Sequence, residues 1–90
     1  MMKVHDLKIW RRWFMDAVTG AKSFEVRRND RDFHVGDILR LWEYDEVEWR
    51  ITGRTTTVEV VYMTNLTDIG MTGYVAMGTK RVNDIWGGRP

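Results

Sequence analysis

The spacing of hydrophobic residues changes once near the N-terminus. Residues 3–9 alternate, with His5, Leu7 and Ile9 on one side, which is typical of a β-strand. The spacing then becomes that of an amphipathic helix, with apolar positions at Trp10, Trp13, Phe14, Ala17 and Val18. Gly20 can end this helix in the left-handed conformation. The pattern predicts a strand followed directly by a short helix, whose apolar side packs on a sheet.

Strict alternation returns in residues 22–28. Phe24 and Val26 point to one side of this predicted strand, whereas Glu25 and Arg27 point to the other. If the apolar pair faces the core, Glu25 and Arg27 share the opposite side of the strand.

The rest of the chain is typical of three strands joined by polar turns. The strands are expected at 37–45, 55–63 and 74–82. In the second of them Val58, Val60 and Tyr62 lie in register on one side. Loops and turns are expected at 29–37, 46–50, Gly53 and 65–73, with a loose C-terminal end at 84–90.

The composition indicates a single folded domain over residues 1–90. Hydrophobic residues make up 43% of the chain and aromatic residues 12%, including five tryptophans, which is enough for a core. We expect most of the tryptophans, Trp10 and Trp13 in particular, to lie in that core. The predicted fold class is α+β, mainly β: a small β-barrel of about five or six mostly antiparallel strands with a helix after the first strand.

The charges are unevenly distributed along the chain. Residues 1–31 contain eight Lys or Arg and four Asp or Glu, whereas residues 32–70 contain three and eight. A basic region opposite an acidic one suits an anionic ligand, and plain solvation of the surface is the alternative. The N-terminal segment has no uninterrupted apolar run, so neither a signal peptide nor a membrane span is predicted. Together with the lack of cysteine, this favours a cytoplasmic protein.

Metal and cofactor chemistry is not predicted. His5 and His34 are far apart, without cysteine or a His-x-x-Glu spacing, so we expect no bound metal. His5 is expected to be a structural histidine, and without a phosphate-binding glycine loop no cofactor is expected. The candidates for catalysis are Lys22, Ser23 and Glu25, since a buried lysine beside a hydroxyl can act as base and nucleophile. Adjacent positions on a strand, however, point Lys22 and Ser23 to opposite faces.

Basic and aromatic side chains make nucleic acid the favoured partner. Guanidinium groups bind phosphate oxygens bidentately, and tryptophan rings stack on bases. Trp42 and Trp49 are freer for stacking than the tryptophans of the helix. The residues expected to contact nucleic acid are Lys8, Lys22, Glu25, Arg27, Arg28, Asn29, Arg31 and Trp42.

Several segments resemble one known family in order and spacing. They are HDLKIW (5–10), WF (13–14), GAKSFEVRRNDRDFHVGDILRLWEYD (20–45), TGR (52–54), VVYM (60–63) and GYVAMG (73–78). The resemblance is to DUF3850, a bacterial and phage family related to the ASCH domains of the PUA-like superfamily. Its centre is a Gly-x-Lys-x-x-Glu-x-Arg motif, here Gly20, Lys22, Glu25 and Arg27, followed by Asn29-Asp30-Arg31.

The resemblance implies a β-barrel with a helix at its mouth and a cleft that in relatives is associated with RNA or modified nucleosides. Lys22, Glu25 and Arg27 fall on the motif positions that line this cleft. Some ASCH-like proteins are amidohydrolases that deacetylate a modified cytidine, using a lysine, a threonine three residues later and a distant glutamate. Lys22 matches the lysine, whereas Glu25 stands at the position of the threonine.

Three functions therefore remain open. The first is a binding module for RNA, single-stranded nucleic acid or a modified nucleoside, and the second is an amidohydrolase acting on a nucleoside such as N4-acetylcytidine. The third is a phage or mobile-element domain that binds a host protein through Trp42 and Trp49 beside the acidic stretch 43–48. The alternative to ligand binding is structural: a buried network of Glu25, Arg27 and Asp30 that fastens the loop to the helix.

Overall fold

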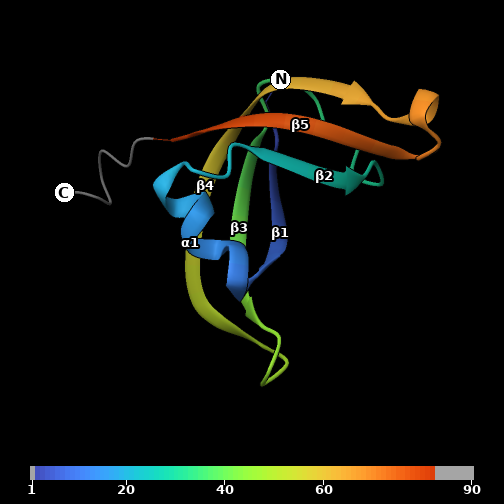
Figure 1. Cartoon of the computed structure of the whole chain (residues 1–90). Coiled ribbons are helices and arrows are strands. Elements are labelled where there is room, and N and C mark those ends of the chain that lie inside the picture. Colours follow the sequence, from blue (N-terminus) through green and yellow to red (C-terminus); the bar gives the residue numbers. More distant parts are fainter. Residues whose placement is uncertain (1, 83–90) are drawn as a thin grey trace.

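The computed structural model describes residues 2–82 and is mainly β, with one α-helix (Figure 1). Its elements are β1 (Val4–Trp10), α1 (Arg11–Thr19), β2 (Phe24–Arg28), β3 (Ile38–Asp45), β4 (Arg50–Asn65), the 3-10 helix η1 (Thr67–Ile69) and β5 (Tyr74–Arg81). The predicted loose end at 84–90 lies outside the described residues. Within residues 2–82, no helix has the length and apolar character needed to cross a membrane.

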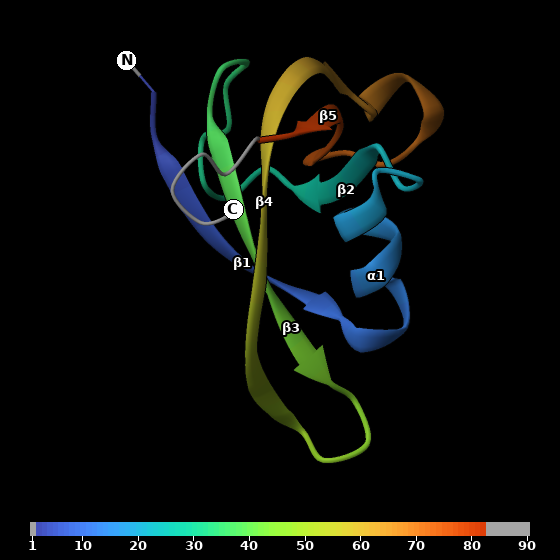
Figure 2. The ribbon, with the colours of Figure 1, turned by 90° about the vertical axis from the view of Figure 1, so that its left-hand side faces the viewer.

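The five strands form one curled, open sheet in the order β1-β3-β4-β5-β2. β1 pairs with β3 in parallel and the other three neighbouring pairs are antiparallel, so the expected antiparallel arrangement is only partly correct. A parallel pair needs a long crossover, which α1 and β2 provide here. β1 and β2 are the two edges of the sheet. The result is a half-barrel, with α1 on its inner side, where a barrel was predicted (Figure 2).

α1 covers one hydrophobic core on the concave side of the sheet. Its buried residues are Phe14 and Ala17, and Phe33 joins them from the loop before β3. The sheet contributes Leu7, Ile9, Leu39, Leu41, Val58, Val60, Val75 and Met77. As predicted, the helix ends at Gly20, whose φ of 87° is left-handed. Burial of each large apolar side chain stabilises the fold by roughly 1.5–3 kcal/mol, so this short helix depends on the sheet beneath it.

β4 is one long strand, and the turn predicted at Gly53 is wrong. The turn between β3 and β4 lies at residues 46–49. Gly53 lies where the register between the two strands shifts, and its φ of 100° is a value that glycine adopts readily at a β-bulge. A second register shift, between Val60 and Tyr62, turns Tyr62 outward. Its side chain is therefore exposed and does not continue the buried row of Val58 and Val60.

A buried network fastens β1 to the loop before β3. His5 Nε2 lies 2.8 Å from Asp37 Oδ2, and both side chains are buried. The backbone N–H groups of Lys3 and His34 also donate to this carboxylate, at 3.1 and 2.9 Å. His5 therefore has a structural role, as predicted from its position.

Acid should weaken this network. Burial raises the pKa of Asp37, but the hydrogen bonds from His5, Lys3 and His34 outweigh burial and hold the pKa below its ordinary value of 3.8. The unfolded chain therefore binds the proton at a higher pH than the folded chain. The carboxylate stabilises the fold fully above about pH 4, and this contribution is lost as the pH falls through the lowered pKa.

We therefore expect the free energy of unfolding to fall more steeply with acid in the wild type than in Asp37→Asn. Urea titrations between about pH 5 and pH 2.5 measure the two slopes. Equal slopes in the two proteins would show that Asp37 contributes nothing to the acid sensitivity.

Candidate functional site

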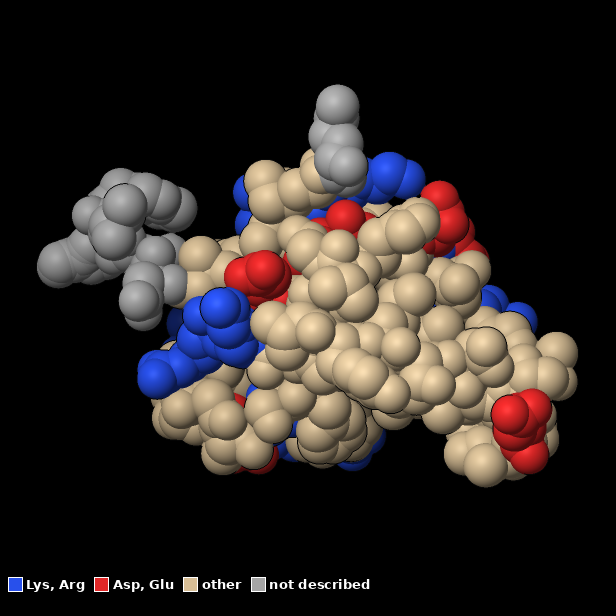
Figure 3. All heavy atoms as spheres, turned by 90° about the horizontal axis from the view of Figure 1, so that it is seen from above, with Lys and Arg blue, Asp and Glu red and all other residues tan. Residues whose placement is uncertain are grey.

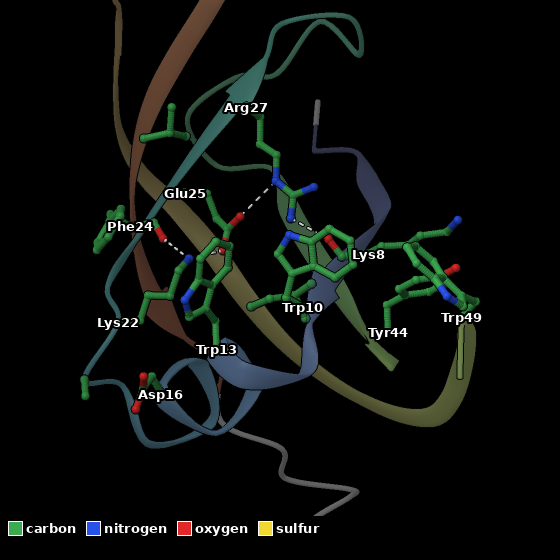
Figure 4. Close-up of a pocket in the computed structure, with 13 residues that line it drawn as sticks. Lys8, Trp10, Trp13, Asp16, Lys22, Phe24, Glu25, Arg27, Tyr44 and Trp49 are labelled. Atoms are coloured by element: carbon green, nitrogen blue, oxygen red, sulfur yellow. Dashed lines mark hydrogen bonds and ion pairs between the residues drawn. The ribbon is translucent and has the colours of Figure 1, made fainter. Parts of the chain in front are cut away.

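A cavity of about 1030 Å³ lies at the opening of the half-barrel, between the edge strands β1 and β2 (Figure 4). α1 borders it on one side, and the end of β3 and the following turn border it on another. The residues that line it are Lys8, Ile9, Trp10, Trp13, Asp16, Ala21, Lys22, Phe24, Glu25, Val26, Arg27, Tyr44 and Trp49. The structure thus brings Lys22, Glu25 and Arg27 of the motif together on one cavity.

Glu25 is the centre of a charged triad. Its carboxylate accepts hydrogen bonds from Lys22 Nζ at 2.5 Å and from Arg27 Nε at 2.9 Å, one on each oxygen. Only 5% of the Glu25 side chain is exposed, against 15% for Lys22 and 25% for Arg27. Lys22 Nζ also donates to Phe24 O, and Arg27 Nη2 donates to Lys8 O, both at 2.7 Å. The triad carries one net positive charge and ties β2 to β1 across the opening.

The predicted facing of β2 is wrong. Glu25 and Arg27 lie opposite buried residues of β5 and point to the core side, whereas Phe24 and Val26 are 54% and 44% exposed. Figure 3 shows the molecule from above, where the surface over β5 and the end of β4 has few charged side chains at its centre. The charged pair is tolerated on the inner side because each oxygen of Glu25 has a cationic donor, which offsets the cost of removing the carboxylate from water.

Five aromatic residues line the cavity: Trp10, Trp13, Phe24, Tyr44 and Trp49. Trp10 and Tyr44 meet edge to face with ring centroids 5.7 Å apart, and Lys8 Nζ lies 4.9 Å from the Tyr44 centroid. Trp13 and Trp49 are both exposed. The predicted core position is therefore wrong for Trp13 and only partly correct for Trp10, which is half-buried.

The prediction placed Trp10 and Trp13 in the core because it assigned the helix too wide a buried side. A helix of nine residues has one narrow buried side, and Phe14 and Ala17 occupy it. Trp13 lies at the border of that side, with the Arg12 guanidinium 4.9 Å from its ring and 5.6 Å from the ring of Trp10. The sequence did contain a signal that these rings are exposed: an arginine, Arg12, lies between the two tryptophans. Cations stack on aromatic rings that solvent can reach.

Five predicted site residues do not line the main cavity: Ser23, Arg28, Asn29, Arg31 and Trp42. Ser23 is exposed and lines a separate hollow of about 400 Å³. Arg28 is exposed, with its guanidinium 5.2 Å from the Tyr74 ring. Asn29 Oδ1 accepts a hydrogen bond from Phe33 N at 3.2 Å, which shapes the loop before β3. The contact set predicted from sequence is therefore divided between different surfaces.

Arg31 and Trp42 both bind Asp6 on β1. Arg31 Nη1 donates to Asp6 O at 2.9 Å, and Trp42 Nε1 donates to Asp6 Oδ1 at 2.8 Å. Hydrogen bonds lower the pKa of Asp6 to about 2; the bond from Arg40 has the largest effect and the bond from Trp42 the next largest. Trp42 is half-buried beside Asp6, whereas the exposed Trp49 lines the cavity, so the two rings have different surroundings.

The cavity has little net charge. Lys8, Lys22 and Arg27 are cationic, and Asp16 and Glu25 are acidic, which leaves a formal charge of +1. Among residues 2–82 no group of three or more His, Cys, Asp or Glu side chains is arranged to hold a metal ion. The lining suits a ligand with an aromatic ring, a hydrogen-bonding edge and a small negative charge.

The chain is similar to a family of known sequences and to a phage protein. The model of the family described as "Domain of unknown function (DUF3850)" matches residues 4–79. The "Uncharacterized 12.9 kDa protein in GpA 3'region" of Escherichia phage P2 is 34% identical over 68 residues, which cover 76% of this chain. The match spans 61% of the phage protein's own length.

Proposed function

The chain belongs to the DUF3850 family, whose matched region contains every residue that lines the cavity, and from this premise we propose that it binds RNA or a modified nucleoside there. We also propose that the family shares its ancestry with the ASCH domains of the PUA-like superfamily. Two observations support that relationship. The fold is a half-barrel with a helix beside its opening, and the motif residues line the cavity between the half-barrel and the helix.

The observation that carries the proposal is the triad beside the aromatic rings. Arg27 has five N–H donors, and the bonds to Glu25 and Lys8 use two of them. The remaining donors suit the acceptor atoms of a base edge or a phosphate. Trp10 and Trp13 provide rings on which a base can stack. Donors in a fixed position beside stacking surfaces are what recognition of single-stranded nucleic acid requires.

RNA binding should weaken with salt. Each phosphate contact changes log K by about −0.7 per log unit of salt on single strands, so contacts by Lys8, Lys22 and Arg27 would give a slope of about −2. Fluorescence anisotropy of a labelled RNA hexamer of random sequence measures this slope over a salt series. Without saturable binding at low salt, the RNA proposal fails.

A matched pair of lysine variants locates the contact. Lys8→Ala should remove about a third of the slope, because one of three cations is lost. Lys80→Ala should leave the slope unchanged, since Lys80 lies outside the cavity and its amine is 3.9 Å from a Glu59 carboxylate oxygen. Equal effects of the two substitutions would argue for diffuse attraction rather than binding in the cavity.

An amidohydrolase is the second candidate, and the contact between Lys22 and Glu25 is the observation that favours it. The lysine amine and the carboxylate lie 2.5 Å apart on the cavity. In this proposal Glu25 takes a proton from the water that attacks the amide carbonyl and Lys22 donates one to the nitrogen that leaves, which gives cytidine and acetate. Because Ser23 does not line the cavity, Glu25 would have to act at the position of the threonine. Incubation with N4-acetylcytidine, followed by chromatography for cytidine, tests this. Product that Lys22→Ala abolishes would support it, and no product at high protein concentration would exclude this substrate.

A further inference from the structure

The turn between β3 and β4 holds a tryptophan in a conformation that tryptophan rarely adopts. Trp49 has a φ of 57°, in the left-handed region that favours glycine and asparagine. Its side chain is 69% exposed, so burial in the core does not compensate for this conformation. Strained backbone that the core does not explain is typical of sites that contact a ligand.

The turn keeps the Trp49 backbone in place. Trp49 N donates to Asp45 O at 2.7 Å, and Asp45 Oδ1 accepts hydrogen bonds from the N–H groups of Val47 and Glu48 at 2.9 and 3.1 Å. Asp45 is in turn bound by Arg11 Nη1 at 3.1 Å, which connects the turn to the start of α1. The ring is therefore presented by an ordered turn before any ligand arrives.

Trp49 lies at the end of the cavity away from the triad. In Figure 4 it stands beside Tyr44, with Lys22 and Trp13 at the opposite end and Trp10 between the two ends. The cavity volume of about 1030 Å³ is at the upper limit of sites that hold a single drug-sized molecule, which is about 1,000 Å³. The cavity therefore has aromatic surfaces at both ends and room for more than one ring.

We propose, on the basis of the function proposed above, that the ligand is a single strand of at least two nucleotides. One base lies at the triad end of the cavity, and the next base stacks on Trp49. The Lys8 amine, 4.9 Å from the Tyr44 centroid, lies at the Trp49 end and provides a cation for the phosphate that links the two nucleotides.

Competition experiments test this proposal. The wild type binds a fluorescein-labelled RNA hexamer of random sequence, and the competitors are the four nucleoside 5′-monophosphates and the four 5′-phosphorylated homodinucleotides. A second stacked base should make the best dinucleotide about 5- to 150-fold more effective than its mononucleotide. Trp49→Gly should remove that advantage, so that the best dinucleotide competes no better than its mononucleotide. Trp49→Tyr, which keeps a ring, should retain most of it.

A matched control separates stacking from backbone strain. Asp32 is the other non-glycine residue with positive φ in residues 2–82, at 53°, and its side chain is exposed. Asp32→Gly and Trp49→Gly should both keep or raise the melting temperature, because glycine relieves the strain. Only Trp49→Gly should weaken dinucleotide binding.

The outcomes distinguish this inference from the function on which it rests. If the wild type binds neither the hexamer nor any competitor, the proposed function is wrong and the two-nucleotide ligand with it. If mononucleotides compete as well as dinucleotides, only the two-nucleotide inference is overturned. The same holds if Trp49→Gly leaves the advantage of the dinucleotides unchanged.

Discussion

Replacing Glu25 with glutamine should destabilise the protein more than any change to a surface charge. The carboxylate is buried and bonded to Lys22 and Arg27. Glutamine keeps one acceptor oxygen for one of these cations, but it sets an N–H donor against the other and removes the negative charge between them. Removal of one member of a buried ion pair costs about 3–5 kcal/mol, and because both cations are partly exposed we expect about 2–4 kcal/mol here. Urea denaturation at neutral pH measures the change in the free energy of unfolding.

Glu59→Gln is the matched control for this prediction. Glu59 is also a strand glutamate with a lysine partner, Lys80, but the two charges are 3.9 Å apart on the surface. An exposed pair of this kind contributes about 0–1 kcal/mol, so the control should change little. If Glu25→Gln lowers the free energy of unfolding as little as Glu59→Gln does, solvent screens the charges of the triad. Glu25→Gln combined with Lys22→Met should recover part of the loss, since one of the two opposed cations is then gone.

Arg27→Ala should weaken both the fold and ligand binding, whereas Arg28→Ala should affect neither strongly. Arg27 donates to Glu25 and to Lys8 O, and so joins β2 to β1 across the opening of the half-barrel. Loss of these charge-assisted hydrogen bonds should cost about 1–3 kcal/mol of stability. Binding of the RNA hexamer should fall as well, because Arg27 lines the cavity. Arg28 is exposed, with Nη2 at 3.5 Å from the Tyr74 hydroxyl.

Thermal melts and anisotropy titrations of the two arginine variants are the measurement. Arg28→Ala should leave the melting temperature nearly unchanged and reduce affinity only slightly, through its charge. Arg27→Met keeps the aliphatic part of the side chain, so a loss similar to that of Arg27→Ala would locate the effect in the guanidinium. Equal, purely electrostatic losses in Arg27→Ala and Arg28→Ala would show that the triad is solvated surface.

The triad can have a structural and a binding role together. Each oxygen of Glu25 accepts a hydrogen bond from a cation, which stabilises the edge strand β2. Arg27 still has donors beyond those it uses within the described residues. Asp30, which sequence reasoning placed in this region, is exposed in the structure. The network that fastens β2 therefore contains Lys22 rather than Asp30.

The sequence by itself determined the local elements of this protein. Spacing alone predicted strands at 3–9 and 74–82, and the structure has β1 and β5 within one residue of those bounds. It also predicted the helix stop at Gly20 and the structural role of His5. These features depend on the periodicity of neighbouring residues and on the conformational freedom of glycine, so no distant partner is needed to infer them. The resemblance to DUF3850, rather than spacing, implied that Lys22, Glu25 and Arg27 line one cleft.

Only the tertiary structure decided which sides of these elements are buried. Alternation in β2 is the same whether Phe24 or Glu25 faces the core, and the pairing of β2 with β5 at the edge of an open sheet settles it. The exposure of Trp13 and the bulge at Gly53 also depend on packing and register between segments distant in sequence. A buried carboxylate is stable there because folding brings Lys22 to one oxygen and Arg27 to the other, which local periodicity does not encode.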